Sequence, residues 1–111
     1  MSRDTEAVVQ NHLQAAGIGL EAVMQDYTDE SILITPDRTY HGPAEIRQFF
    51  TGLFNGPAAK FMDSFVMNRQ EFIGEAGYIN WESKPWFPLA TDTFVVRNGK
   101  IVYQTFTAWP A

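Results

Sequence analysis

The chain has 111 residues, a formal net charge of -5 and no cysteine. It therefore lacks the basic footprint that nucleic acids and anionic membranes require, and disulfides and thiolate chemistry are excluded. Hydrophobic residues make up 45% of the chain and aromatic residues 14%. This composition predicts one globular domain over residues 1–111, with a large core or an apolar cavity.

Metal, cofactor and membrane sites have no visible signature. The two histidines, His12 and His41, lie far apart without ligand-like spacing, and no phosphate loop or dinucleotide fingerprint is present. The N-terminus lacks a basic segment followed by an apolar one, and no apolar run is long enough to span a bilayer. We expect no metal, no cofactor and a cytoplasmic location, with His12 at the surface or on a rim.

Two helices are predicted in the N-terminal quarter. Ser2 or Asp4 can cap the first, which runs to about Ala16, where glycines follow. A strand over 32–35, a turn over 35–38 and a brief second strand come after the second helix. That second helix has apolar residues at i, i+3, i+4 and i+7, namely Leu20, Val23, Met24 and Tyr27.

The third helix has the strongest signal. Pro43 stands at its first position, where the missing N–H costs nothing, and a glycine-proline pair at 56–57 ends it. Its apolar stripe consists of Ile46, Phe49, Phe50, Leu53 and Phe54.

Beyond this helix the spacing of apolar residues changes from a period of 3.6 to a period of 2 residues. This change predicts strands over 61–72, 78–83, 91–97 and 101–108. Residues 74–77 and the pair Asn98-Gly99 are expected to form hairpin turns, and prolines 85 and 88 an irregular rim. Three helices followed by antiparallel strands predict an α+β fold.

Three short motifs carry a resemblance to a known family. In order they are Asp26-Tyr27-x-Asp29-Glu30, Thr35-Pro36 and His41-Gly42-x-x-x-Ile46. With them the chain resembles the SnoaL-like and ketosteroid-isomerase-like branches of the nuclear transport factor two-like superfamily. The resemblance implies a cone, the cystatin-like α+β roll, in which three N-terminal helices pack in a curved mixed or antiparallel sheet around an internal pocket.

Asp92 is the first candidate for chemistry. Alternation places it with Phe94 and Val96 on one face of a strand, and an apolar face disfavours the charged form of a carboxyl group. In the ketosteroid isomerases, an aspartic acid that its apolar surroundings keep neutral donates a hydrogen bond to the developing oxyanion. The resemblance gives Asp92 this role; a structural or solvent-facing carboxylate is the alternative.

The rest of the isomerase site is only partly matched. Where the resemblance expects the general base, before Pro36, this chain has Thr35, which cannot abstract a carbon-bound proton unaided. The supporting tyrosine at the end of the second helix corresponds to Tyr27, whereas the one on the third helix corresponds to Phe50, and the oxyanion tyrosine of the first helix to Asn11. Steroid isomerisation by the usual mechanism is therefore not expected.

Three other ionisable residues have a structural role as the alternative to a catalytic one. Asp37 could reach the mouth of the cone, or it could cap its turn. Glu82 could form a carboxylate pair with Asp92 if it faces inward, or it faces outward if Trp81 faces the core. His41 could move a proton at neutral pH, or it could satisfy the start of the third helix.

Aromatic residues would line any cavity in the cone, and otherwise they fill it. With Thr35, those expected to contact a flat apolar ligand are Phe50, Phe54, Trp81, Phe94 and Phe106; Phe49, Phe61, Phe65 and Trp109 belong to the same aromatic set.

Three functions remain open. The first is a cofactor-free acid/base enzyme (isomerase, dehydratase or cyclase type) acting on a small hydrophobic carbonyl compound, with Asp92, Tyr27 and His41 as catalytic residues. The second is a non-catalytic binder of an apolar metabolite, and the third an assembly domain with a filled cone. A homodimer through the outer face of the sheet is expected in each case, because the outward positions Val95, Ile101, Tyr103 and Thr105 are too apolar for open solvent.

Overall fold

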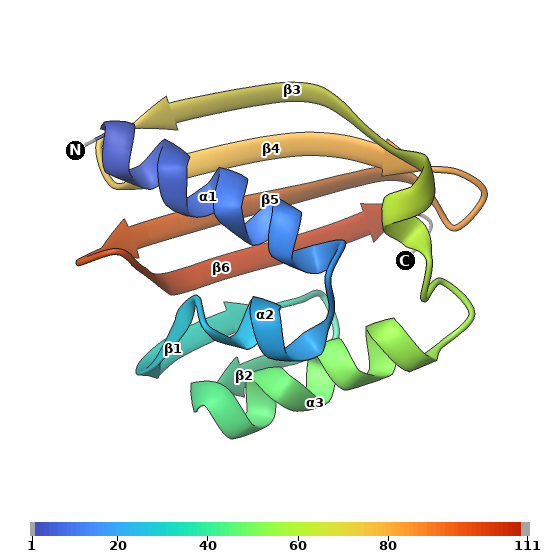
Figure 1. Cartoon of the computed structure of the whole chain (residues 1–111), viewed down its shortest axis with the longest axis horizontal. Helices are drawn as coiled ribbons and strands as arrows, with labels where there is room; N and C mark the ends of the chain where they lie inside the picture. The colour runs from blue at the N-terminus through green and yellow to red at the C-terminus, as the bar shows by residue number, and fades with distance from the viewer. Residues whose placement is uncertain (1, 110–111) are drawn as a thin grey trace.

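The structure is a computed structural model that describes residues 2–109. Figure 1 shows the helices in the first half of the chain and the long strands in the second. The elements in chain order are α1 (Ser2–Ala16), α2 (Leu20–Met24), β1 (Tyr27–Ile34), β2 (Thr39–His41), α3 (Gly42–Asn55), the 3-10 helix η1 (Phe61–Ser64), β3 (Phe65–Ile73), β4 (Ala76–Ser83), β5 (Phe87–Arg97) and β6 (Lys100–Trp109).

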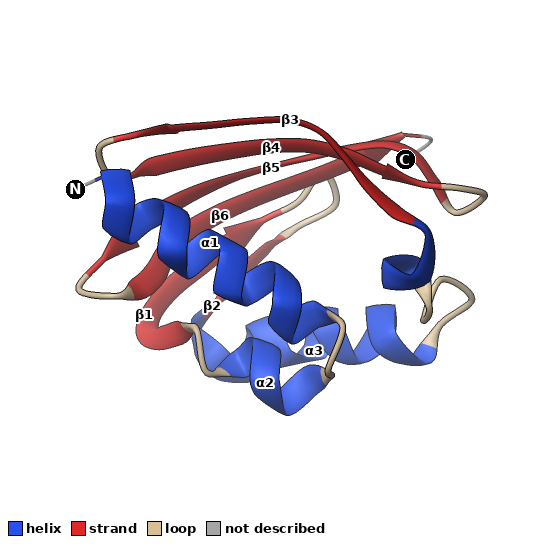
Figure 2. Cartoon of the chain, turned by 45° about the horizontal axis from the view of Figure 1, so that its top comes forward, coloured by secondary structure: helices blue, strands red, loops and turns tan. Residues whose placement is uncertain are grey.

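The strands form one mixed sheet in the order β2-β1-β6-β5-β4-β3. Neighbouring strands are antiparallel except β1 and β6, which are parallel. The sheet curves over the helices, which lie on its concave side (Figure 2). The predicted α+β cone with a mixed sheet is confirmed.

Helices α1 and α3 close the concave side of the sheet. Helix α1 packs against β3, β4 and β5, while α3 packs against β1, β2 and α2. The close approach of α1 to β4 depends on Gly77, because a Cβ atom there would lie only 3.3 Å from Val9 Cγ2 and 3.0 Å from Phe72 Cδ1. The inner face of the central strands is therefore separated from solvent.

The turn between β5 and β6 has the geometry that its sequence predicts. Asn98 and Gly99 have φ angles of 51° and 75°, the left-handed conformation that a type I′ turn requires at both central positions. Next to this turn Arg97 pairs with Lys100 and Val96 with Ile101, so β5 and β6 pair directly from the turn onward.

Tyr27 does not end the second helix as predicted. Helix α2 ends at Met24, and Tyr27 opens β1, where it lies beside Ile101 of β6. The backbone N–H of Ile101 donates to the carbonyl of Asp26 over 2.8 Å. Pairing with β6 overrides the local helical pattern, because five residues of helix propensity weigh less than a strand pairing in the core.

The strand predicted from residue 61 begins at Phe65. Residues 61–64 form η1 instead, and the Ser83 hydroxyl donates to the Phe61 carbonyl and holds this turn against β4. Strand β5, by contrast, begins at Phe87 and includes Pro88, four residues before the predicted start. Periodicity failed at the first place because a tertiary hydrogen bond decides where β3 starts. At the second, Phe87 pairs with Ser83 across an irregularity in the register of β4 and β5, the kind of position that accommodates a proline in a sheet.

Ile101 was predicted to face outward and is fully buried. The register of β5 and β6 shifts between Val95 and Val96, and an extra residue of this kind reverses the alternation beyond it. Tyr103 and Thr105 do face outward, whereas Ile101 belongs to the core.

Candidate functional site

The cone contains a small cavity of about 50 Å³ between α1, α3 and the inner face of the sheet. Its polar lining residues are His12, Asp92 and Gln104. All other lining residues are apolar, with aromatic rings from α3, η1, β3, β4, β5 and β6. The cavity is therefore mostly filled by aromatic side chains and has one polar wall.

Asp92 stands at the centre of that wall and is 6% exposed. Its position on β5 lies between β4 and β6, where Trp81 and Gln104 occupy diagonal positions on the same face. Trp81 Nε1–H donates to Asp92 Oδ1 over 2.8 Å, and Gln104 Nε2–H donates to Asp92 Oδ2 over 2.9 Å. Each carboxyl oxygen thus accepts one hydrogen bond from a neighbouring strand.

Burial is the main influence on the proton affinity of Asp92. Desolvation raises the pKa of Asp92, while the hydrogen bonds from Trp81 and Gln104 and the nearby His12 lower it in part. The net result is a pKa raised from 3.8 to about 6. At pH 7 the group is therefore mostly a carboxylate. This does not fit the role of neutral hydrogen-bonding acid that the resemblance implied for Asp92.

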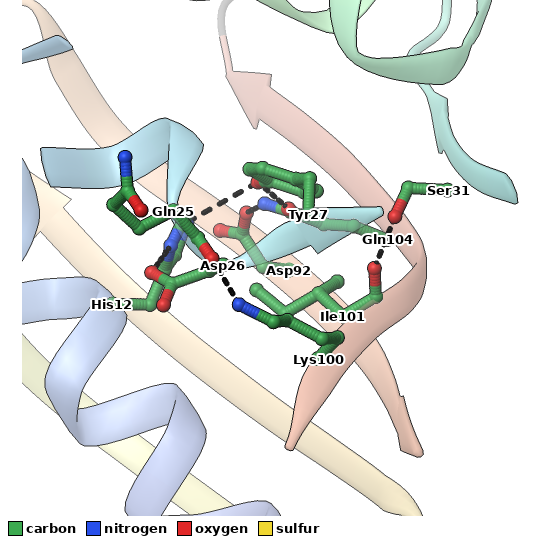
Figure 3. A network of polar contacts seen from close by, with 9 residues as sticks. All are labelled: His12, Gln25, Asp26, Tyr27, Ser31, Asp92, Lys100, Ile101 and Gln104. Atoms are coloured by element: carbon green, nitrogen blue, oxygen red, sulfur yellow. Dashed lines mark hydrogen bonds and ion pairs between the residues drawn. The ribbon is translucent and has the colours of Figure 1, made fainter. Parts of the chain in front are cut away.

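Gln104 connects Asp92 to residues on the other side of the cone. The Tyr27 hydroxyl donates to Gln104 Oε1, and the same hydroxyl lies 3.3 Å from His12 Nε2. His12 Nδ1 lies 2.8 Å from Asp26 Oδ2. Figure 3 shows these side chains as one connected set that leads from Asp26 to Asp92.

His12 was predicted to be a surface or rim group and is 4% exposed. Its ring makes edge contacts with Tyr27, Phe50 and Phe94 at centroid distances of 5.5, 6.1 and 5.8 Å. The buried face of α1 includes positions 9, 12, 13 and 16, so the i, i+3, i+4, i+7 stripe of the helix contains His12. That spacing is the signal that would have identified it.

Gln104 was also missed by the sequence interpretation. It faces inward because Tyr103 and Thr105 face outward, so strand alternation was the available signal. Asp26 belongs to the first of the three motifs, but its contact with His12 joins α1 to the turn before β1, and only the fold determines how these two segments lie.

Most of the predicted ligand contacts are brought together. Phe50, Trp81, Phe94 and Phe106 line the cavity with Asp92. Phe54 lies behind the lining and stacks on Phe50 and Phe61 at centroid distances of 6.1 and 6.2 Å. Of the wider aromatic set, Phe49, Phe61 and Phe65 line the cavity, whereas Trp109 is 67% exposed on the sheet.

Thr35 and His41 lie away from the cavity. The Thr35 hydroxyl accepts from the backbone N–H of Arg38 and donates to its carbonyl, so it organises the turn before β2. His41 is exposed at the start of α3, and its side chain makes no capping hydrogen bond; its backbone N–H donates to Glu45 Oε1 instead. Neither side chain is placed to act with Asp92.

Asp37 and Glu82, the other two candidate carboxylates, both have structural roles outside the cavity. Asp37 is exposed in the turn, and its backbone N–H donates to Thr35 Oγ1. Trp81 is buried, and Glu82 faces outward beside Asn68 and Lys84. Glu82 and Asp92 therefore do not form a pair.

Within residues 2–109, no cluster of three or more His, Cys, Asp or Glu side chains is arranged to hold a metal ion. None of the helices in this range is both long and apolar enough to cross a membrane.

Comparison with solved structures shows the fold. A de novo designed protein with a curved β-sheet superposes with a TM-score of 0.80 at 18% identity, covering 99% of this chain and 88% of that one. A candidate ketosteroid isomerase from Kribbella flavida has a TM-score of 0.75 at 13% identity, covering 99% and 81% of the two chains. A SnoaL-like protein of unknown function from Burkholderia thailandensis has a TM-score of 0.75 at 12% identity, covering 96% and 94%.

Other matches are named NTF2-like proteins, so the chain has the NTF2-like fold. No protein-family model matches the sequence, and no curated protein does either. At these identities the likeness concerns the fold and leaves the chemistry to be argued from the residues of the cavity.

Proposed function

We propose that this chain, which has the NTF2-like fold, is a cofactor-free acid/base enzyme of isomerase, dehydratase or cyclase type that acts on a small hydrophobic carbonyl compound. The observation that carries the proposal is Asp92, a buried carboxyl group on the wall of an apolar cavity with a pKa of about 6. Buried ionisable groups with shifted pKa values concentrate at functional sites, and a pKa near the working pH suits proton transfer.

Asp92 acts as the general base in this proposal. Its two oxygens accept hydrogen bonds from Trp81 and Gln104, which orient the carboxylate within the sheet. Each oxygen keeps a further lone pair, so the carboxylate can accept a proton from a carbon next to a carbonyl group and return it at another atom. Tyr27 contributes indirectly, as a hydrogen-bond donor to Gln104.

The size of the cavity limits the substrate. A volume of about 50 Å³ holds very few atoms, and the half-buried rings of Phe49, Phe65, Phe87 and Phe106 form part of its wall. A monocyclic, planar substrate that displaces some of these rings fits this site better than a fused multi-ring one. The aromatic lining favours a flat apolar body with a single carbonyl oxygen.

Proton exchange tests the proposal without knowledge of the product. We expect the protein in heavy water to catalyse exchange of the carbon-bound protons next to the carbonyl of a small cyclic enone such as cyclohexenone, followed by proton NMR. Asp92→Asn should slow this exchange by about a hundredfold or more, the usual contribution of a general base. The rate should rise with pH up to about 6, where Asp92 ionises, and then level off.

Glu82→Gln is the matched control, because Glu82 is the outward-facing carboxylate next to Trp81. Exchange that is equally fast in Asp92→Asn and in the parent protein would contradict the assignment of the base. Absence of exchange across a panel of small ketones and enones would remove the enzyme proposal.

A non-catalytic binder is the second candidate, and the mostly apolar lining favours it. A planar phenol separates the two. Saturable phenol binding without any catalysed exchange of ketone protons indicates a binding protein, whereas both together indicate an enzyme.

We also propose that the chain forms a homodimer through the outer face of the sheet. The outward positions of β5 from residue 89 to 95 and of β6 from residue 103 to 109 carry no charged side chain. They are Leu89, Thr91, Thr93, Val95, Tyr103, Thr105, Thr107 and Trp109. Depletion of charge with exposed tyrosine and tryptophan is typical of interface cores, and a second copy of the same uncharged face is the occupant that this composition favours.

A further inference from the structure

The polar wall of the cavity is one end of a hydrogen-bonded chain that extends beyond the proposed base. It runs from Asp92 through Gln104 and Tyr27 to His12 and ends at Asp26, which is partly exposed (Figure 3). Of its members, His12, Asp92 and Gln104 line the cavity, although His12 comes from α1 and the other two come from the sheet.

The donors and acceptors of this chain can be counted. Gln104 has one end that donates and one that accepts, so its orientation fixes what its neighbours must do. Tyr27 supplies a single proton, because burial and the charges of Asp92 and Asp26 raise its pKa well above 10.0 and keep the hydroxyl protonated. The Asp92 oxygen that does not face Gln104 is held by Trp81, which can only donate.

In the observed arrangement the amide of Gln104 donates to Asp92, which must therefore accept as a carboxylate. The hydroxyl proton of Tyr27 is used on Gln104 Oε1, so the Tyr27 oxygen can only accept from His12 Nε2. His12 Nδ1 faces the carboxylate of Asp26. In this arrangement both ring nitrogens of His12 serve as donors, which requires a proton on each.

When the side-chain amide of Gln104 rotates by about 180°, a second arrangement forms hydrogen bonds between the same residues. Protonated Asp92 then donates to Gln104 Oε1, and Gln104 Nε2–H donates to the Tyr27 oxygen. Tyr27 donates to His12 Nε2, which has lost its proton, and Nδ1–H still donates to Asp26. The two arrangements hold the same number of protons: one has left His12 and one has been added to Asp92.

We propose that Asp92 and His12 are a coupled pair that holds one exchangeable proton between them, and that the amide orientation of Gln104 selects which of the two carries it. Groups coupled in this way titrate as a unit rather than as independent sites. His12, Tyr27 and Gln104 are positioning residues here, since they act on the cavity through Asp92.

Among the described residues, Asp26 is the charged group in direct contact with this pair. Around His12 and Asp92, β1 and its preceding residue contribute Tyr27 and Asp26, and the lining residues from α3 are aromatic or aliphatic. On β6 the charged neighbour is Lys100, whose Nζ donates over 2.6 Å to the carbonyl of Gln25 beside Asp26. Asp26, whose side chain is 19% exposed, and Lys100 stand at the outer end of the chain of hydrogen bonds.

This coupling also bears on catalysis by Asp92, a point that rests on the proposed function. In the first arrangement His12 is positive and Asp92 negative, and in the second both are neutral, so Asp92 can carry a proton without a change in the net charge of the pair. A buried carboxylate without such a partner would change the charge of the cavity at every proton transfer.

Nitrogen NMR of the histidine rings tests the coupling in the intact protein and needs no substrate. His41 is exposed and serves as the internal reference in the same spectra. In the parent protein at neutral pH, both nitrogens of His12 should be protonated. In Asp92→Asn, Trp81 holds the amide oxygen and the amide NH₂ faces Gln104, which forces the second arrangement. We expect His12 there to be neutral, with a bare Nε2 and about tenfold or more weaker proton binding, the strength at which two sites count as coupled.

Gln104→Met separates the hydrogen-bonded route from the direct effect of charge. With the amide removed, replacing Asp92 by Asn should change His12 far less than it does in the parent background. Tyr27→Phe breaks the chain at a second point and should give the same result, which keeps the test valid if one variant fails to fold. Glu82→Gln should leave His12 unchanged.

An unchanged His12 spectrum in folded Asp92→Asn would overturn the proposal. An effect of Asp92→Asn that persists undiminished in both Gln104→Met and Tyr27→Phe would also overturn it, because simple charge attraction would then explain the result. Neither outcome depends on the catalysed exchange of ketone protons, so failure of the enzyme proposal and failure of the coupling are distinguishable.

Discussion

At the scale of single residues, Asp92 defines the site because it is an ionisable side chain in an otherwise apolar part of the core. It is an ionisable group among aromatic rings, held by donors from the two adjacent strands. A fold selected for stability alone would place an apolar residue there, since burying a carboxylate is unfavourable even when it is hydrogen-bonded. The conflict is what makes a functional role for Asp92 worth testing.

The raised pKa of Asp92 predicts how stability depends on pH. The folded protein keeps the Asp92 proton up to about pH 6, whereas the unfolded chain releases it near the ordinary value of 3.8. Between these values the folded state binds more protons, so the free energy of unfolding falls as the pH rises. A shift of this size corresponds to about 3 kcal/mol at about 1.36 kcal/mol per pH unit.

Urea unfolding of the parent protein and of Asp92→Asn between pH 4 and pH 7 measures this effect. We expect the stability of Asp92→Asn relative to the parent to increase by on the order of 3 kcal/mol across that range, since the asparagine does not ionise. Glu82→Gln, at the surface, should follow the parent closely. Parallel curves for Asp92→Asn and the parent would show that Asp92 is not buried in the folded state.

At the scale of elements, the site depends on how closely α1 approaches β4. His12 reaches Tyr27 and the cavity only because α1 lies directly on the sheet, and the absence of a side chain at Gly77 makes room for Val9 of α1. A side chain at Gly77 would contact Phe72 and Val9 at distances that few real Cβ atoms show.

Two glycine substitutions with opposite expected signs test this packing. Gly77→Ala should destabilise the protein by about 1–3 kcal/mol, the usual cost of overpacking a core. Gly52→Ala, in α3 with no atom within 4 Å of the added methyl group, should stabilise it by up to about 1 kcal/mol, because alanine is the better helix former. Chemical denaturation measures both. A neutral Gly77→Ala would mean that α1 sits farther from β4.

At the scale of the whole molecule, the sheet has two different faces. The helices and the cavity lie on the concave face, while the outer face over residues 89–95 of β5 and 103–109 of β6 is uncharged and rich in threonine. An antiparallel sheet can leave one face in water, but its outer residues are then usually polar and charged.

Sedimentation tests the proposed pairing of these outer faces. Thr105 lies opposite Thr93 near the centre of the uncharged region, so Thr105→Lys would bring like charges together across a twofold interface. Such a juxtaposition costs several kcal/mol, and we expect the dimer to dissociate at least about a hundredfold more readily. Ile18→Lys, at an exposed position between α1 and α2, is the control and should remain dimeric. A parent protein that sediments as a monomer at micromolar concentration contradicts the pairing itself.

Local patterns in the sequence determined much of this protein. The 3.6 and 2 periods predicted the three helices and the long strands, and Asn98-Gly99 predicted the turn that joins β5 to β6. Alternation placed Asp92, Phe94 and Val96 together on one face of a strand, which the structure shows to be the inner one. These features depend on neighbours a few residues apart, which is the range over which backbone preferences and side-chain faces act.

Only the tertiary structure decided the composition of the polar wall. Asp26 meets His12, Tyr27 meets Gln104 and Trp81 meets Asp92 across different elements, and a register shift beside Val96 buried Ile101. The same structure left Thr35 and His41 at the surface, although their motifs had indicated a site. Hydrogen bonds between residues distant in sequence depend on strand order, register and helix position together, and no local pattern in the chain encodes all three.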